Sequence, residues 1–546
     1  METKKNKEPE LIADRQALLR TFITPEREEA RATLLKYMEQ VLFGLHDFLI
    51  QHVGITQEKS LMELSVYFQD SNISKNPEKK LADVIKDLID DIAPHAVNVA
   101  SPYFIGHMTS AIPFFMVHLK TIVAALNQNV VKLETSKVVS VVEKQVLAKI
   151  HKLVYRKPEE FYEEHIQNTY TTLGAFVEGG TSANLTALWV ARNIVFAPKG
   201  DFLGIESEGL QAAYKAYGVE RCVVLVSRRG HYSLRKAGGL LGIGNQNIIP
   251  INVDAKHRID LECLSQTIKD IKKEGKTKII AVIGIAGTTE TGTVDPLEKM
   301  AEICSENGIH FHVDAAFGGP VLMSDKYKNL LAGIELADSV AIDGHKQFYM
   351  PMSCGMVYFK SPTIMDAIEY HANYVIRPGS VDLGSKTFSG SREANSLILD
   401  SALKIMGSNG YALLINHGIE LARRFADEIN KRTMFQLVTT PMLNILTYRV
   451  CPPEYMKDLS SGEPENKRST NKKLNEINRD VQRIQREAGK SFVSRTLLFE
   501  GNNSEDRVVV LRCVIMNPLT DMKIIKEILD EQEAIYKDIV FEQENS

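Results

Sequence analysis

Several features that mark particular protein classes are missing from this chain. No apolar run is long enough to span a bilayer, and the first ten residues are mostly charged or polar, so we expect neither a membrane span nor a secretory signal. The six cysteines form no Cys-x-x-Cys pair, so we expect reduced thiols and a cytoplasmic location, without structural disulfides or zinc. A net charge of −4 provides no strong basic field, which argues against nucleic acid as a partner.

The composition that is present suits a soluble globular protein of two or three domains: 546 residues, 44% hydrophobic and 25% charged. Residues 1–95 have helical periodicity, as at 34–45, and predict an N-terminal helical segment. Residues 96–391 alternate short apolar runs with helical patterns and predict a large α/β domain. Residues 392–546 predict a small α+β domain, in which the polar stretch 451–490 indicates an exposed loop followed by a charged helix.

Apolar runs in the middle of the chain predict buried strands. They occupy residues 221–227, 278–285, 309–313 and 339–342. Because the runs are continuous rather than alternating, we expect a mainly parallel sheet covered by helices on both faces. One of the helices is expected at 296–307, where Pro296 marks the start and Gly308 marks the end.

Two of these runs end close to residues whose chemistry is complementary. Lys346 comes directly after His345 beyond the run at 339–342, and Asp314 follows the run at 309–313. A lysine among apolar neighbours loses hydration of its charged form, so a nucleophilic amine becomes available. Pyridoxal phosphate needs such a lysine for its Schiff base and an aspartate that keeps its ring nitrogen protonated. The pair therefore predicts a pyridoxal phosphate site.

Each of these residues also has a simpler explanation. Lys346 could be an exposed lysine at a strand end, and Asp314 could cap the next helix. His310, His312 and Asp314 alternate along one strand, so they share a face and could hold a metal ion, although no fourth ligand is signalled nearby. Ala315 and Ala316 favour the pyridoxal interpretation, because a flat ring lying against a strand end needs small side chains below it.

Three further motifs also precede or follow predicted elements at positions where open α/β sheets bind ligands. Residues 178–184, Glu-Gly-Gly-Thr-Ser-Ala-Asn, precede a helix, and their glycines and free amides suit a phosphate group. The alternative there is an ordinary capped helix. His231 could stack on a cofactor ring or could be a histidine bonded within a loop. Residues 287–292, Gly-Thr-Thr-Glu-Thr-Gly, provide the third motif.

Taken in order, the motifs resemble those of the pyridoxal-phosphate-dependent amino-acid decarboxylases of the glutamate and aromatic-amino-acid decarboxylase family. They lie at residues 179–184, 231–233, 287–292, 312–319 and 338–346. The resemblance runs from about residue 102 to beyond residue 518. Segments at 102–110, 126–130 and 491–495 are similar to a bacterial subgroup regarded as pyridoxal-dependent aspartate 1-decarboxylases or glutamate-decarboxylase-like proteins.

The resemblance implies a role for individual residues. The catalytic set would be Lys346 as the Schiff-base lysine, Asp314 as the partner of the ring nitrogen, and His231 stacked on one ring face with Ala316 under the other. The cofactor phosphate would be surrounded by Thr181, Ser182, His345 and, from the neighbouring subunit, Ser353. The substrate would meet Arg512, which grips a carboxylate, together with His107, Asn127 and Arg392. The family also implies the aspartate-aminotransferase-like fold, with residues 96–391 as the cofactor-binding domain, and a homodimer with its active site at the interface.

The chain departs from the family in one loop. Family members carry a mobile loop after the lysine, and a tyrosine in that loop is thought to supply a proton during the reaction. Here residues 379–391 are short and contain no tyrosine, and the nearest one is Tyr374. The proton donor could therefore be His231, Lys346 or a water molecule.

The expected function is α-decarboxylation of an acidic L-amino acid by a pyridoxal phosphate enzyme, with L-aspartate giving β-alanine. The alternatives are L-glutamate decarboxylation, another pyridoxal reaction such as transamination or carbon–carbon lysis, and a dimer that binds the cofactor without catalysis. Neither a membrane nor a nucleic acid is expected as a partner.

Overall fold

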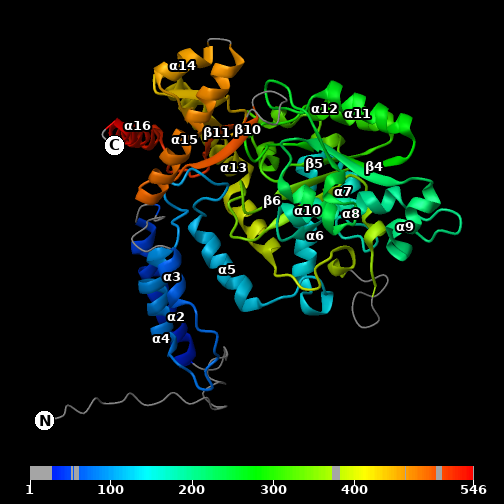
Figure 1. The fold of residues 1–546 in the computed structure, drawn as a ribbon. Helices are drawn as coiled ribbons and strands as arrows, with labels where there is room; N and C mark the ends of the chain where they lie inside the picture. The colour runs from blue at the N-terminus through cyan, green and yellow to red at the C-terminus, as the bar shows by residue number, and fades with distance from the viewer. Residues whose placement is uncertain are drawn as a thin grey trace.

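A computed structural model describes residues 28–50, 53, 61–371, 382–460, 463–499 and 507–544 (Figure 1). The central sheet has seven strands in the order β1-β7-β6-β5-β4-β2-β3. Strands β2, β3, β4, β5 and β6 run parallel to one another, and β7, between β6 and β1, is antiparallel to both. The bounds are β1 Gly174–Val177, β2 Arg221–Ser227, β3 Ile248–Ile251, β4 Thr277–Ile285, β5 His310–Asp314, β6 Ser339–Asp343 and β7 Gly355–Phe359.

Helices cover both faces of this sheet, as the continuous apolar runs predict. On one face lie α8 (Gly180–Val195), α9 (Ile205–Tyr217) and α10 (Tyr232–Leu240). On the other lie α6 (Val138–Tyr155), α11 (Leu261–Glu274) and α12 (Leu297–Asn307). The prediction of α12 is confirmed: Pro296 is its N-cap, and Gly308 ends it with a left-handed backbone, φ +64°, that glycine adopts without strain.

The chain continues into a smaller, antiparallel sheet of order β10-β11-β9-β8. Its strands are β8 Phe435–Thr439, β9 Ile445–Val450, β10 Ser494–Phe499 and β11 Arg507–Val514. The long helix α13 (Asn395–Lys431) packs on the smaller sheet and also contributes side chains to the core of the large region, and its backbone breaks at Gly407. The remaining helices of this region are α14 (Pro453–Ser460), α15 (Pro464–Ala488) and α16 (Met522–Glu544).

The fold class is confirmed, with one local correction. The beginning of the 451–490 stretch, which we predict to be a loop, instead contains α14. Proline is compatible with the first turn of a helix, so Pro453 starts this helix rather than preventing it. The predicted domain boundaries at residues 95 and 391 stay predictions.

The N-terminal helices α2 (Glu28–Ile50), α3 (Leu61–Tyr67) and α4 (Leu81–Asp87) extend away from the body of the molecule in Figure 1. They are followed by α5 (Phe114–Leu126) and, after α6, by the short α7 (Glu159–His165). None of the helices in the described ranges is long and apolar enough to cross a membrane.

Candidate active site

A cavity of about 440 Å³ opens at the carboxyl ends of β1, β2, β4, β5 and β6. This end of a parallel sheet is where loops converge and ligands bind. The walls of the cavity bring together most of the residues that the sequence nominates, namely His107, Thr181, Ser182, His231, Asp314, Ala316, His345 and Lys346.

Lys346 follows the end of β6, and its side chain is 19% exposed. Its Nζ lies 2.9 Å from Oδ2 of Asp343, the last residue of the strand. The second oxygen of Asp343, Oδ1, is buried and has no hydrogen-bond partner within the described structure. The purely apolar environment expected for the lysine is therefore wrong, because its amine forms an ion pair with a carboxylate three residues earlier.

Asp314 ends β5, and its carboxylate is held at both oxygens. Oδ2 accepts a hydrogen bond from Nδ2 of Asn184 at 2.8 Å, and Oδ1 accepts one from the backbone N–H of Ala316 at 3.2 Å. The residue is only 7% exposed. A carboxylate fixed in this way can present charge in a defined direction within the cavity.

The loop before α8 forms another wall. A Cβ atom at Gly180 would come within 3.0 Å of both the Ala316 side chain and the Asp343 carboxylate, and one at Gly179 would lie 3.2 Å from the His345 ring. Glycine therefore permits the backbone to approach the ends of β5 and β6. Thr181 and Ser182 stand in the first turn of α8, where backbone N–H groups and the helix dipole favour an anion.

His231 is the N-cap of α10 and lines the same cavity. Its Nδ1 lies 2.8 Å from Oγ of Ser233, which fixes the plane of the imidazole. Burial lowers the pKa of His231, and the nearby carboxylate of Asp314 opposes that shift. With its bond to Ser233, the imidazole therefore has a fixed orientation at the wall of the cavity.

Arg512 on β11, in the smaller sheet, lies behind one wall of the cavity. Its Nε donates to the backbone oxygen of Thr289 at 2.6 Å, and its Nη1 donates to that of Gly106 at 3.1 Å. Thr289 and His107, next to Gly106, are themselves cavity walls. The remaining nitrogen, Nη2, is buried without a partner among the described residues, and burial lowers the pKa of Arg512 to about 10. Burial and the charge of Arg512 also lower the pKa of His107.

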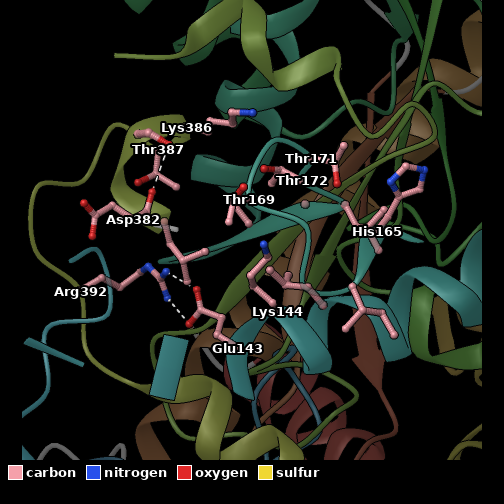
Figure 2. A pocket seen from close by; sticks show the side chains of 17 residues that line it. Glu143, Lys144, His165, Thr169, Thr171, Thr172, Asp382, Lys386, Thr387 and Arg392 are labelled. Atoms are coloured by element: carbon pink, nitrogen blue, oxygen red, sulfur yellow. Dashed lines mark hydrogen bonds and ion pairs between the residues drawn. The ribbon is translucent and has the colours of Figure 1, made fainter. Parts of the chain in front are cut away.

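Arg392 does not reach this cavity. Its guanidinium forms a two-pronged ion pair with Glu143 on α6, with Nη1 at 2.9 Å from Oε2. Figure 2 shows this pair at the edge of a second cavity, whose walls also include Lys144, Thr171 and Lys386. In the single chain, Arg392 therefore lies outside the first cavity and is paired with a buried carboxylate at both terminal nitrogens, and its contact with substrate stays a prediction.

Two other nominated residues lie outside the first cavity. Asn127 ends α5 in a left-handed conformation, φ 47°, as its C-cap. Ser353 lines a separate depression beside Glu178, Arg392 and Asn395. Since Ser353 is expected to act from the neighbouring subunit, its position in one chain neither supports nor opposes that role.

The sequence-based assignment gave no role to three polar residues that line the cavity, Asn184, Asp343 and Arg229. Asn184 belongs to the motif 179–184, and its distance from Asp314 in the sequence hides their contact. Asp343 stands three residues before Lys346, a spacing that could have indicated the pair. Arg229 is buried in the cavity wall and pairs with Glu290 at 2.8 Å, and the Arg-Arg sequence before His231 was the available signal.

The sequence left two questions open: whether His310, His312 and Asp314 form a metal site, and which group donates the proton in place of the missing loop tyrosine. Within the part of the chain that the structure describes, no three His, Cys, Asp or Glu side chains gather as metal ligands. Tyr374 and residues 379–381 of the tyrosine-free loop lie outside the described residues, so the proton donor stays a prediction.

The residues of the first cavity fit pyridoxal phosphate. Lys346 supplies an amine, Asp314 supplies a buried carboxylate, and the glycines before α8 leave space beside the small Ala316 side chain. A strand-end lysine, a fixed aspartate and a helix N-terminus are the donor set that this cofactor requires.

Comparison with known proteins agrees with this donor set. The conserved domain of the pyridoxal-dependent decarboxylases matches residues 64–451, so the chain belongs to this family and is a pyridoxal phosphate-dependent amino-acid decarboxylase. The chain is 43% identical to "Aspartate 1-decarboxylase" of Aliivibrio fischeri, across 95% of this chain and 94% of that protein. It is 29% identical to "Acidic amino acid decarboxylase GADL1" of Homo sapiens, across 74% and 72% of the two chains.

Solved structures share the fold at lower identity. The crystal structure of mouse CSAD superposes with a TM-score of 0.79 at 22% identity and covers 93% of this chain and all of that one. Catharanthus roseus tryptophan decarboxylase, solved with L-tryptophan, superposes with a TM-score of 0.75 at 20% identity over 94% of this chain. At these identities the likeness establishes the architecture alone.

Proposed function

We propose that this decarboxylase acts on an acidic L-amino acid and prefers L-aspartate, which it converts to β-alanine and carbon dioxide. The observation that carries the proposal is Arg512, a buried guanidinium with a free Nη2 behind the wall formed by His107 and Thr289. A planar guanidinium suits a carboxylate better than any other substrate group. The 43% identity to the Aliivibrio fischeri aspartate 1-decarboxylase supports aspartate as that substrate.

The other cavity residues would hold the cofactor. Lys346 would bind it covalently through Nζ, Asp314 would hold a proton on its ring nitrogen, and Thr181, Ser182 and His345 would contact its phosphate. When bound, pyridoxal phosphate provides the electron sink for the electrons left behind as the carboxylate departs. Because the carboxylate of Asp314 is fixed before the reaction, no reorganisation is needed when charge develops.

His231 and Lys346 are the two described side chains that we propose as candidate proton donors after carbon dioxide leaves. Both line the cavity, and Nζ of Lys346 lies 2.9 Å from Oδ2 of Asp343. His231→Phe would remove one donor without removing the covalent link to the cofactor.

We also propose a homodimer with its active sites at the interface. Apolar side chains on α5 are open to solvent in the single chain, including Phe114, which is 77% exposed, and Ile122. A patch of this kind marks a protein–protein contact. The predicted contribution of Ser353 from a second subunit requires such an arrangement.

A competition assay tests the substrate. Purified holoenzyme is given equal concentrations of L-aspartate, L-glutamate, L-cysteine sulfinate and L-phenylalanine, and carbon dioxide and the amine products are quantified. We expect one carbon dioxide per amine, with β-alanine as the main product and a smaller yield of 4-aminobutyrate. One methylene typically changes discrimination by only about 1–3 kcal/mol, so some glutamate turnover is expected.

The same assay separates the alternatives. A main product of 4-aminobutyrate would make the enzyme a glutamate decarboxylase, and phenethylamine would overturn the role of Arg512. Keto-acid formation without carbon dioxide would indicate transamination. No turnover with any acid, by a protein that retains bound cofactor, would favour a non-catalytic dimer.

A further inference from the structure

A chain of buried polar side chains begins at Asp314 and leads away from the cavity. Asn184 on α8 donates through Nδ2 to Oδ2 of Asp314 at 2.8 Å. Its Oδ1 lies 2.9 Å from Nε2 of His312, which is fully buried. Nδ1 of His312 lies 2.9 Å from Oγ of Ser339, and the same hydroxyl lies 2.8 Å from Nε2 of His310.

The direction of every hydrogen bond in this chain follows from the carboxylate at its end. An ionised carboxylate only accepts, so Asn184 must present its amide N–H to Asp314 and its carbonyl oxygen to His312. Nε2 of His312 must then carry the proton. A neutral imidazole has one N–H, so Nδ1 accepts from Ser339, whose oxygen is left to accept from His310.

The histidines have the protonation state that this direction requires. Burial lowers the pKa of His312 to about 4, and burial also lowers that of His310. Both rings are therefore neutral at pH 7. The three N–H groups and one O–H group along the chain all point toward Asp314, so each bond polarises the next.

We infer that His312, supported by Ser339 and His310, is a positioning residue that fixes the Asn184 amide and thereby aims the carboxylate of Asp314 at the ring nitrogen of the cofactor. This inference rests on the role proposed above for Asp314. A carboxylate fixed in this position would hold a proton on the ring nitrogen of the bound cofactor. Without His312, the carbonyl of Asn184 loses its donor and the amide is free to turn away from Asp314.

The competing explanation is that His312 only fills the core of the protein. Another buried histidine of this protein provides a matched control. His151 on α6 is also fully buried, and burial lowers its pKa to about 4 as well. Both of its nitrogens are hydrogen-bonded, at 3.0 Å to the Tyr162 hydroxyl and at 3.0 Å to the Phe359 carbonyl. In the described structure, the two nitrogens of His151 bond Tyr162 and Phe359 and are not part of the hydrogen-bond chain that ends at Asp314. His151→Phe therefore reproduces the loss of a buried histidine and leaves that hydrogen-bond chain intact.

The test uses holoenzyme reconstituted with pyridoxal phosphate labelled with ¹⁵N in the ring, and the ¹⁵N chemical shift reports protonation of that nitrogen directly. In His312→Phe we expect the shift to move toward that of the unprotonated ring, and kcat to fall about tenfold with little change in KM. His312→Gln, whose amide can donate to Asn184, should lie closer to the wild type. His151→Phe should match the wild type in both measurements.

Asp314→Asn separates the two levels of the inference. If this variant loses ring protonation while His312→Phe keeps the wild-type shift and kcat, the chain behind Asn184 is only structural and the inference fails. If Asp314→Asn itself keeps a protonated ring, the role of Asp314 fails and the inference falls with it. Should His312→Phe not give folded holoenzyme, Ser339→Ala provides the same comparison with the loss of one hydroxyl, and an unchanged ¹⁵N shift there overturns the inference.

Discussion

Arg512 and Arg392 are both buried, and the surroundings of their guanidinium groups differ. Arg392 meets the carboxylate of Glu143 with two hydrogen bonds, and both side chains are almost completely enclosed. Arg512 meets two backbone carbonyls and the hydroxyl of Ser494, and no carboxylate in the described structure lies within ion-pair distance of it.

The difference distinguishes a charge that is neutralised within the protein from one that is not. A buried cation without an anion is costly, and at Arg512 this cost falls beside the cofactor cavity. At Arg392 the charge is already neutralised by Glu143. Under the role proposed for Arg512, the same residue type would bind a ligand in one region and stabilise the fold in the other.

The largest difference between the cofactor cavity and the second cavity is expected when a lysine is replaced in each, Lys346 in the first and Lys386 in the second. Lys346→Ala should remove the link between enzyme and cofactor that borohydride reduces, and decarboxylation should fall below detection. Lys386→Ala is the matched control, because Lys386 is buried beside the second cavity and pairs with Asp366. It should retain the borohydride-reducible link. Absence of that link in the wild-type holoenzyme would contradict the assignment of Lys346.

Removing the charge of Arg392 should cost stability rather than activity. Arg392→Gln leaves the carboxylate of Glu143 buried without its partner, which typically costs about 3–5 kcal/mol. Urea unfolding of the holoenzyme measures the loss, and kcat/KM of the folded fraction should change little. A large loss of kcat/KM at unchanged stability would place Arg392 in the substrate site after all.

Arg512 should respond in the opposite way. Arg512→Lys keeps the positive charge but cannot form two parallel hydrogen bonds with a carboxylate, so kcat/KM should fall by roughly 10–100-fold, mainly through KM. Stability in urea should stay within about 1 kcal/mol of the wild type, because no internal carboxylate loses its partner. Equal losses of stability in the Arg512 and Arg392 variants would remove the distinction between the regions.

The smallest effect concerns Lys144 in the second cavity. Burial, assisted by the charge of Lys386, lowers the pKa of Lys144 to about 8, so the folded state binds its proton less tightly than the unfolded state. Stability should therefore rise as the pH increases from about 8 toward 10.5, the ordinary value for lysine.

Lys144→Met should remove this pH dependence. Because the side chain is partly exposed, solvent screening reduces the effect, and we expect a gain of only about 1 kcal/mol at pH 7 that disappears near pH 10.5. Thermal unfolding at several pH values measures it. A variant less stable than the wild type at pH 7 would indicate that the hydrogen bond from Nζ of Lys144 to the backbone oxygen of Asn168 outweighs the cost of burial.

Sequence alone predicted four of the seven strands of the central sheet, and it placed Lys346 and Asp314 at the ends of two of them. The strands β2, β4, β5 and β6 coincide with the predicted runs to within one or two residues, because continuous apolar runs fit a sheet that is covered on both faces. Lys346 and Asp314 meet in one cavity because parallel strands bring their carboxyl ends to the same edge. Both inferences use only local pattern and the direction of strands.

The sequence could not determine which side chain pairs with each buried charged group. Glu143 lies 249 positions before Arg392, and Asn184 lies 130 positions before Asp314. No local pattern predicts such contacts, since they depend on how helices α6 and α8 pack against the sheet. Residue type and order therefore set the fold and the chemistry that is available, whereas packing decided that, among the described residues, Arg392 meets a buried carboxylate and Arg512 meets none.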